Sequence, residues 1–417
     1  MIFKYLKNIE KGALFSIFSR ALSSIGTFLI SLYLIKNLNV SSYGIYSSIF
    51  GISMLLAGLV TSIFTTQMIA ITSKKNNSEI NYLSIEYYYM QNIIFFILLA
   101  LSYLLISFNV LNQAPFNEYL IIFSLLIAWG VASKDVLTSR SFLIRDNKTP
   151  FILNIASLVV LVGYILVNQN FLNESKIYGL EFPIVFFIIF MFLYLITKGL
   201  ALFKLKKIYF VYAREALKNG KWAFLQSISR YFRTQSYVLA ALFFLGVYEI
   251  GFINSVLIYV LPITVLYSAL SQYFLPKISV DYERGRNIKQ TITQIIFFII
   301  GSFILYLLMI LLLKDDLNVL IFREEVIKNS YFNTTLYFWL IISLIQGVNA
   351  IFFMEYQSKK MFKYLAIVSS AAAVLSLVLA IIGIKLFGIL GLMCSLLFVE
   401  IFIFALLMMH KISKTYV

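Results

Sequence analysis

The sequence predicts an all-α polytopic membrane protein, with about twelve transmembrane helices in two parallel six-helix halves around a central cavity. Its 417 residues are 61% hydrophobic and only 12% charged, a balance that excludes a soluble globular chain of this length. Apolar runs long enough to cross a bilayer recur along the whole chain. Short motifs of the first half return in the second half, in the same order.

Each expected helix is an apolar run of roughly 20 residues, the length that crosses the hydrocarbon core. The basic leader at 1–11 is like that of a signal peptide. The run behind it is long and lacks a small-residue cleavage site, so we expect it to be retained as the first helix. The spans are expected at 12–36, 44–71, 87–108, 119–140, 150–168, 182–203, 222–246, 251–273, 292–313, 332–354, 364–384 and 389–409.

The links between the spans alternate in charge. Most of the 34 lysines and arginines fall in the N-terminal leader, in every second link and in the tail. The positive-inside rule therefore places both termini in the cytoplasm. This bias, together with attraction to anionic lipid headgroups, accounts for the net charge of +16 without a nucleic-acid partner.

The longest polar link, KLKKIYFVYAREALKNGK at 204–221, is expected to be a basic surface helix between an N-terminal half (1–203) and a C-terminal half (222–417). An even number of spans in each half makes the halves parallel repeats, which in transporters hold the substrate between them. The recurring motifs are Ser19-Arg20 with Ser229-Arg230, Tyr43-Gly44-Ile45 with Ile250-Gly251-Phe252, and Trp129 with Trp339.

The first span and its counterpart at 222–246 each carry a polar stripe at helical spacing. Lipid disfavours such a stripe, so both should face protein or water. They place Arg20, Arg230 and Arg233 where their forked donors suit a phosphate group. The alternative is that Arg20 and Arg230 reach toward the interface or hold helices together. The stripes are Ser16, Arg20, Ser23, Thr27 and Ser31, and Gln226, Ser229, Arg230, Arg233 and Ser236.

Three further charged residues interrupt apolar spans. Lys134 has two readings, a buried cation for phosphate or sugar and a local ion pair with its neighbour Asp135. Glu400 is the acid in the middle of the last span, where a carboxylate must be neutral or paired. Glu400 and Asp135 are therefore candidates for coupling to H⁺ or Na⁺, or for counter-ions to the basic residues.

Pro262 interrupts the span at 251–273, where it removes a backbone hydrogen bond and kinks the helix. A hinge for alternating access and a static kink are both compatible with this position.

Several kinds of chemistry lack the residues they require. With one cysteine and one histidine, Cys394 and His410, the chain has no His/Cys set for a metal. No nucleophile–base constellation and no Walker motif occur, so neither an enzyme, nor ATP use, nor a cofactor is expected.

The motifs resemble those of the polysaccharide transporter family in the multidrug/oligosaccharidyl-lipid/polysaccharide exporter superfamily. The resemblance covers essentially the whole chain. It is carried by the stretch from Asn8 to Gly12, NLNVSSYGIYSSIFG from Asn37 to Gly51, IGFINS from Ile250, YFLPKIS from Tyr273 to Ser279, and KLFGILGLMCSLLFVE from Lys385 to Glu400.

The resemblance, with twelve spans, implies the O-antigen or capsular repeat-unit flippase (Wzx-type) branch. Such proteins move undecaprenyl-diphosphate-linked oligosaccharides across the bacterial inner membrane, from its inner to its outer leaflet. For this chain the resemblance implies that Arg20, Arg230 and Arg233 contact the diphosphate. A polysaccharide polymerase or ligase is an expected partner machinery.

Three alternatives remain at this stage. A multidrug or cation antiporter of the same superfamily would favour acids over arginines in the cavity. A membrane polysaccharide polymerase or ligase would favour a large external loop, whereas the longest expected one spans only 314–331. A teichoic acid or lipid II flippase would share the mechanism and differ in its cargo.

Overall fold

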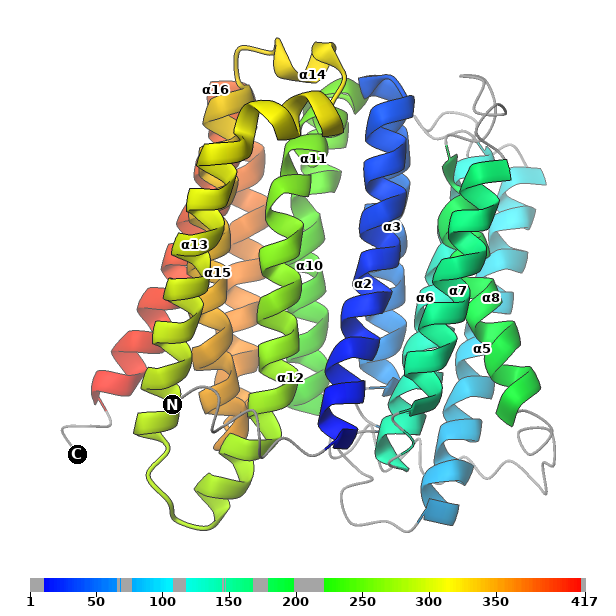
Figure 1. Cartoon of the computed structure of the whole chain (residues 1–417), viewed down its shortest axis with the longest axis vertical. Helices are drawn as coiled ribbons and strands as arrows, with labels where there is room; N and C mark the ends of the chain where they lie inside the picture. Colours follow the sequence, from blue (N-terminus) through cyan, green and yellow to red (C-terminus); the bar gives the residue numbers. More distant parts are fainter. Residues whose placement is uncertain are drawn as a thin grey trace. The chain divides into compact units, whose positions relative to one another are not determined.

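The computed structural model describes residues 11–65, 68, 77–107, 118–144, 146, 148–167, 179–198 and 221–413 (Figure 1). Within these ranges the chain is helical and contains no β-strand. Eight helices of the described part are long and apolar enough to cross a membrane, and Ala21–Asn37 and Glu181–Thr197 are shorter apolar helices. The chain is thus a multi-pass helical membrane protein, as its composition predicts. The count of twelve spans in two halves stays a prediction.

The helices of the first part are α2 (Lys11–Asn37), α3 (Val40–Ile63), α5 (Asn77–Ser107), α6 (Glu118–Leu143), α7 (Lys148–Val167) and α8 (Glu181–Lys198). Those of the second part are α10 (Lys221–Phe244), α11 (Val247–Leu257), the short 3₁₀ helix η3 (Ile258–Val260), α12 (Leu261–Glu283), α13 (Lys289–Ile321), α14 (Glu324–Ile327), α15 (Phe332–Ser358) and α16 (Phe362–Ser413). The expected linker at 204–221 lies outside the described residues, except for Lys221.

Two helix boundaries differ from expectation, because hydropathy indicates where the lipid begins and not where a helix ends. Helix α5 begins at Asn77, so Glu86 lies within it rather than in a link. Helix α13 continues to Ile321 and includes Asp315 and Asp316, which were expected in an external link. The last two expected spans, 364–384 and 389–409, correspond to the two helical segments of α16, which meet where the backbone turns at Gly388 with φ of 60°. Glycine adopts this left-handed conformation without a steric penalty.

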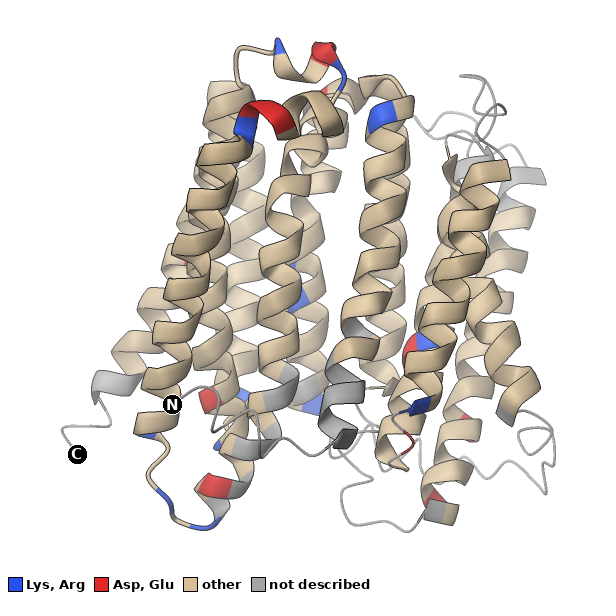
Figure 2. Ribbon diagram, viewed as in Figure 1, with Lys and Arg blue, Asp and Glu red and all other residues tan. Residues whose placement is uncertain are grey.

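The chain forms two compact units. Unit 1 comprises Met1–Thr27 and Ile49–Tyr231, and unit 2 comprises Phe28–Ser48 and Phe232–Val417. Helix α6 is central in unit 1, where it packs against α5, α7 and α8. Helix α15 is central in unit 2, where it packs against α11, α12, α13 and α16. In both units the charged residues gather near the helix ends (Figure 2).

Two of the repeated glycines meet inside unit 2. A Cβ atom on Gly44 of α3 would overlap the carbonyl oxygen of Val247, and one on Gly251 of α11 would overlap that of Val40. The crossing therefore requires glycine at both positions. The contact is also reciprocal, because Val40 and Gly44 precede Val247 and Gly251 by the same 207 positions. A two-fold axis between repeated segments produces this kind of reciprocity.

Candidate functional site

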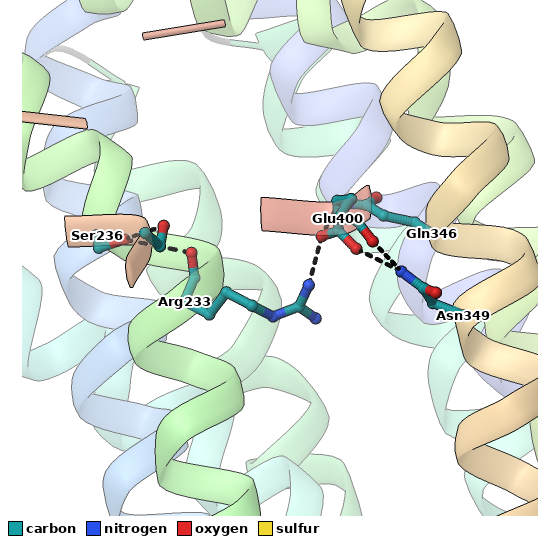
Figure 3. A network of polar contacts seen from close by, with 6 residues as sticks. Arg233, Ser236, Gln346, Asn349 and Glu400 are labelled. Carbon is teal, nitrogen blue, oxygen red and sulfur yellow. Dashed lines mark hydrogen bonds and ion pairs between the residues drawn. The ribbon is translucent and has the colours of Figure 1, made fainter. Parts of the chain in front are cut away.

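The candidate site in unit 2 is centred on an ion pair between Arg233 and Glu400 (Figure 3). Helix α10 carries Arg233 near its middle, and α16 carries Glu400 on the segment that follows Gly388. The side chains are 13% and 6% exposed, so both charges are largely withdrawn from solvent. Charges in such surroundings persist when they are paired and their other hydrogen-bonding positions are filled.

Helix α15 supplies the remaining partners of the carboxylate. Gln346 Nε2 donates to Glu400 Oε1 at 3.1 Å, and Asn349 Nδ2 donates to Oε2 at 2.9 Å. Asn349 Nδ2 also donates to the backbone oxygen of Glu400 at 3.0 Å. Because the two amides are three positions apart on a helix, they present the same face to α16. Both carboxylate oxygens therefore receive hydrogen bonds, and the Arg233 guanidinium approaches from α10 (Figure 3).

A serine contact lies one turn after Arg233. Ser236 Oγ lies 3.0 Å from Ser376 Oγ, which belongs to the segment of α16 before Gly388, and 3.3 Å from the carbonyl oxygen of Arg233. Helix α10 thus makes polar contacts with both segments of α16.

Unit 1 holds Lys134 on its central helix, α6, among aromatic rings of α8. The side chain is buried, and its ammonium lies 4.2 Å from the ring centre of Phe186, 4.8 Å from that of Phe190 and 5.5 Å from that of Phe187. Ring faces attract a cation, most strongly when it is desolvated. The Lys134 side chain is thus buried against aromatic rings, while its neighbour Asp135 is half-buried, and both readings of Lys134 stay predictions.

The other expected residues have separate placements. Arg20 belongs to α2, and its side chain lies outside the described part of the chain. Arg230 is exposed on α10, with its guanidinium 5.3 Å from the ring centre of Tyr231. Pro262 is the second residue of α12, directly after η3, so the expected span at 251–273 is interrupted there. A first helical turn suits proline because its N–H groups need no intrahelical partner.

Sequence reasoning did not single out Gln346, Asn349 or Arg140. The two amides carry a usable signal, since polar residues three positions apart in an apolar span share a helix face. Arg140 is the last residue of the span expected at 119–140, a position typical of an interfacial basic residue, whereas it is buried near the end of α6. Its partners on α5 and α8 can be identified only from the folded chain.

Within the described ranges of the chain, no group of His, Cys, Asp and Glu could hold a metal ion. The charged groups of the described part instead suit recognition of an anion by guanidinium and ammonium groups, or exchange of a proton at a carboxylate.

No protein-family model matches the sequence. No curated protein matches it either.

Solved structures share the fold. The lipid II flippase MurJ in an inward closed conformation superposes with a TM-score of 0.67 at 15% identity, covering 95% of this chain and 87% of that one. An inward-facing multidrug resistance MATE family transporter of the MOP superfamily gives 0.64 at 10% identity, covering 94% and 96%. A MOP superfamily transporter from Pyrococcus furiosus, described as having a binding pocket of reverse polarity, gives 0.61 at 10% identity, covering 95% and 94%. These neighbours are transporters and flippases. At 10–15% identity, the superpositions show that this chain shares their fold, and nothing more.

Proposed function

We propose that this protein is a flippase that carries undecaprenyl-diphosphate-linked oligosaccharide repeat units from the inner to the outer leaflet of a bacterial inner membrane. The observation that carries the proposal is a guanidinium group, that of Arg233, near the middle of a helix in a fold shared with a lipid II flippase. A diphosphate and a glycan cannot cross hydrocarbon unaided, because desolvating their polar groups is costly. A cationic site inside the protein lowers that barrier.

The Arg233–Glu400 pair suggests how the cargo is accepted. Without cargo, Glu400 neutralises Arg233 and prevents an uncompensated buried charge. A diphosphate can replace the carboxylate, since the guanidinium fork bonds two phosphate oxygens at once. Glu400 then keeps the amide donors of Gln346 and Asn349, or takes up a proton. Proton uptake by Glu400 would couple transport to a proton gradient. Binding of Na⁺ at the same carboxylate is the alternative form of coupling.

Arg20, Arg230 and Lys134 are proposed as further contacts of the diphosphate or glycan, and Asp135 as a second counter-ion. Pro262 is proposed as a hinge. The reciprocal Gly44–Gly251 contact supports the proposal of two related halves, 1–203 and 222–417, joined at 204–221 and moving in alternating access. Both termini are proposed to be cytoplasmic, and a polymerase or ligase is proposed to use the exported units.

The direct test is transport by proteoliposomes. The cargo is a fluorescent undecaprenyl-diphosphate disaccharide, and a membrane-impermeant quencher reports how much of it reaches the quenched leaflet. We expect the unsubstituted protein to accelerate this exchange, Arg233→Gln to abolish the acceleration and Arg233→Lys to retain part of it. Ser302→Ala, on α13, is the matched control for reconstitution, since Ser302 bonds only to its own helix through Phe298. Exchange no faster than in empty liposomes would refute the proposal.

A cation antiporter is the second candidate, favoured by the buried carboxylate of Glu400 and by the MATE transporters among the structural neighbours. It predicts that the protein lowers ethidium accumulation in cells and that Glu400→Gln abolishes this effect. Ethidium efflux without movement of the lipid-linked cargo would favour the antiporter.

A further inference from the structure

A second arginine withdrawn from solvent lies in unit 1, on the same helix as Lys134 and nearer to the end of that helix. Arg140 is on α6, one turn before the helix ends at Leu143, and is only 6% exposed. Its Nε donates to Asn81 Oδ1 of α5 at 3.1 Å, and its Nη1 donates to the hydroxyl of Tyr194 of α8 at 2.9 Å. Ser141 Oγ lies 2.9 Å from the same hydroxyl. Three helices therefore fix the plane of this guanidinium.

All of these partners are neutral. Within the described part of the chain, no carboxylate forms an ion pair with Arg140. The nearest acids along the described chain are Asp135, five positions before Arg140 on α6, and Asp146, which accepts hydrogen bonds from Thr149 at the start of α7. A buried guanidinium with a neutral shell keeps its full positive charge in a medium where charge is costly. An anion from outside the chain would remove this cost.

The guanidinium also has donors to spare. Arginine has five N–H groups, and the bonds to Asn81 and Tyr194 use two of them. Within the described part of the chain, the remaining N–H groups form no further hydrogen bond. A guanidinium edge with free N–H groups matches two oxygens of a phosphate.

The position suits a ligand at the membrane surface. Arg140 lies at the end of unit 1 where α6 ends and α7 begins, and the exposed Lys148 starts α7 at this end. By the positive-inside rule this basic link faces the cytoplasm, at the depth of lipid headgroups. Charged residues of the unit gather near such helix ends (Figure 2).

We infer that Arg140, oriented by Asn81 and Tyr194, forms a phosphate-binding site on the cytoplasmic side of unit 1. Two sources share this chemistry: the headgroup of an anionic phospholipid and a soluble phosphate or diphosphate. The site is distinct from the Arg233–Glu400 pair, and the inference does not depend on what the protein transports.

The test is ligand-dependent thermal stability of the full-length protein in detergent. The probes are dihexanoylphosphatidylglycerol, inorganic phosphate and pyrophosphate, with sodium chloride at matched ionic strength as the reference. We expect a saturable rise in Tm with at least one probe and a loss of at least tenfold in its apparent affinity in Arg140→Gln. Arg140→Lys should retain part of the response. Lys289→Gln, which removes an exposed charge at the start of α13 in unit 2, is the matched control and should respond like the unsubstituted protein.

A second variant keeps the test decisive if Arg140→Gln fails to fold. Asn81→Asp retains Arg140 and supplies it with an internal carboxylate, so it should fold and lose the phosphate response. Saturation by the phosphatidylglycerol alone would identify a lipid headgroup, and saturation by phosphate or pyrophosphate would identify a soluble ligand. The inference is overturned if no probe raises Tm beyond the salt reference, or if Arg140→Gln or Asn81→Asp responds like the unsubstituted protein.

Discussion

Within the described part of the chain, the largely buried Arg233 and the buried Arg140 are held in opposite ways. Arg233 in unit 2 faces the carboxylate of Glu400, which two amides of α15 hold in place. Arg140 in unit 1 faces an amide oxygen and a phenol hydroxyl. The first arrangement is electrically neutral, whereas the second keeps one full positive charge.

The difference shows what a hydrogen-bond partner does for a buried charge. Neutral acceptors orient a guanidinium but leave its charge to attract an anion. A carboxylate cancels the charge, so an incoming anion must first displace it. On this view Arg140 can bind an anion directly, whereas Arg233 can bind one only when the anion displaces the carboxylate of Glu400.

The largest expected effect follows from breaking the neutral pair. Glu400→Ala leaves Arg233 buried without its counter-charge, and removal of one partner of a buried pair costs about 3–5 kcal/mol. The measurement is the free energy of unfolding in mixed micelles. The double variant Arg233→Met/Glu400→Leu should recover most of the loss, because it removes both charges. A loss below about 1 kcal/mol in Glu400→Ala would show that solvent, not Glu400, stabilises Arg233.

A smaller loss of folding stability is expected when one of the neutral partners of Arg140 is removed. Tyr194→Phe removes the hydroxyl that accepts from Nη1, and a hydrogen bond to a charged group contributes about 1.5–3 kcal/mol. The same unfolding measurement applies. Tyr89→Phe is the control, since Tyr89 packs at the edge of the same apolar cluster as Tyr194. Equal effects of the two substitutions would argue that ring packing, not the bond to Arg140, matters.

The sequence predicts the site at Arg233 better than the site at Arg140. Arg233 and Glu400 are conspicuous because charges in the middle of apolar spans are rare. That they pair with each other is a tertiary contact across 167 positions, which periodicity does not encode. Arg140 looks like an ordinary basic residue at a span end, because burial by α5 and α8 leaves no mark on the local pattern.

The sequence likewise predicts some features of the fold and not others. Long apolar runs predict membrane helices and hence the class of protein, since few other structures satisfy the backbone in lipid. They do not predict that α5 begins at Asn77 or that α13 reaches Ile321, because polar residues continue a helix beyond the hydrocarbon. The repeated Gly44 and Gly251 were visible in sequence, whereas their contact with each other required the structure.

The comparison can also be tested by making the surroundings of Arg233 resemble those of Arg140. Glu400→Gln keeps the size of the side chain and removes its charge, so Arg233 would have a neutral shell like that of Arg140. In a chain that also carries Arg140→Gln, phosphate should then raise stability again, by about 1.4 kcal/mol at ten times its Kd. Tm measured against phosphate concentration tests this. No recovery of the response would mean that access or geometry, rather than charge, separates the two sites.

The smallest effect on stability is expected at Lys134, a buried cation of a third kind, held by ring faces. Lys134→Met keeps an unbranched side chain but loses the cation–π attraction, about 2 kcal/mol when desolvated. It also ends the burial of a charge, a gain of similar size and opposite sign. The net change in the free energy of unfolding should therefore stay within about 1 kcal/mol, while transport of a diphosphate cargo should fall if Lys134 contacts it. A loss as large as that of Glu400→Ala would instead show that Lys134 stabilises the fold as strongly as the Arg233–Glu400 pair does.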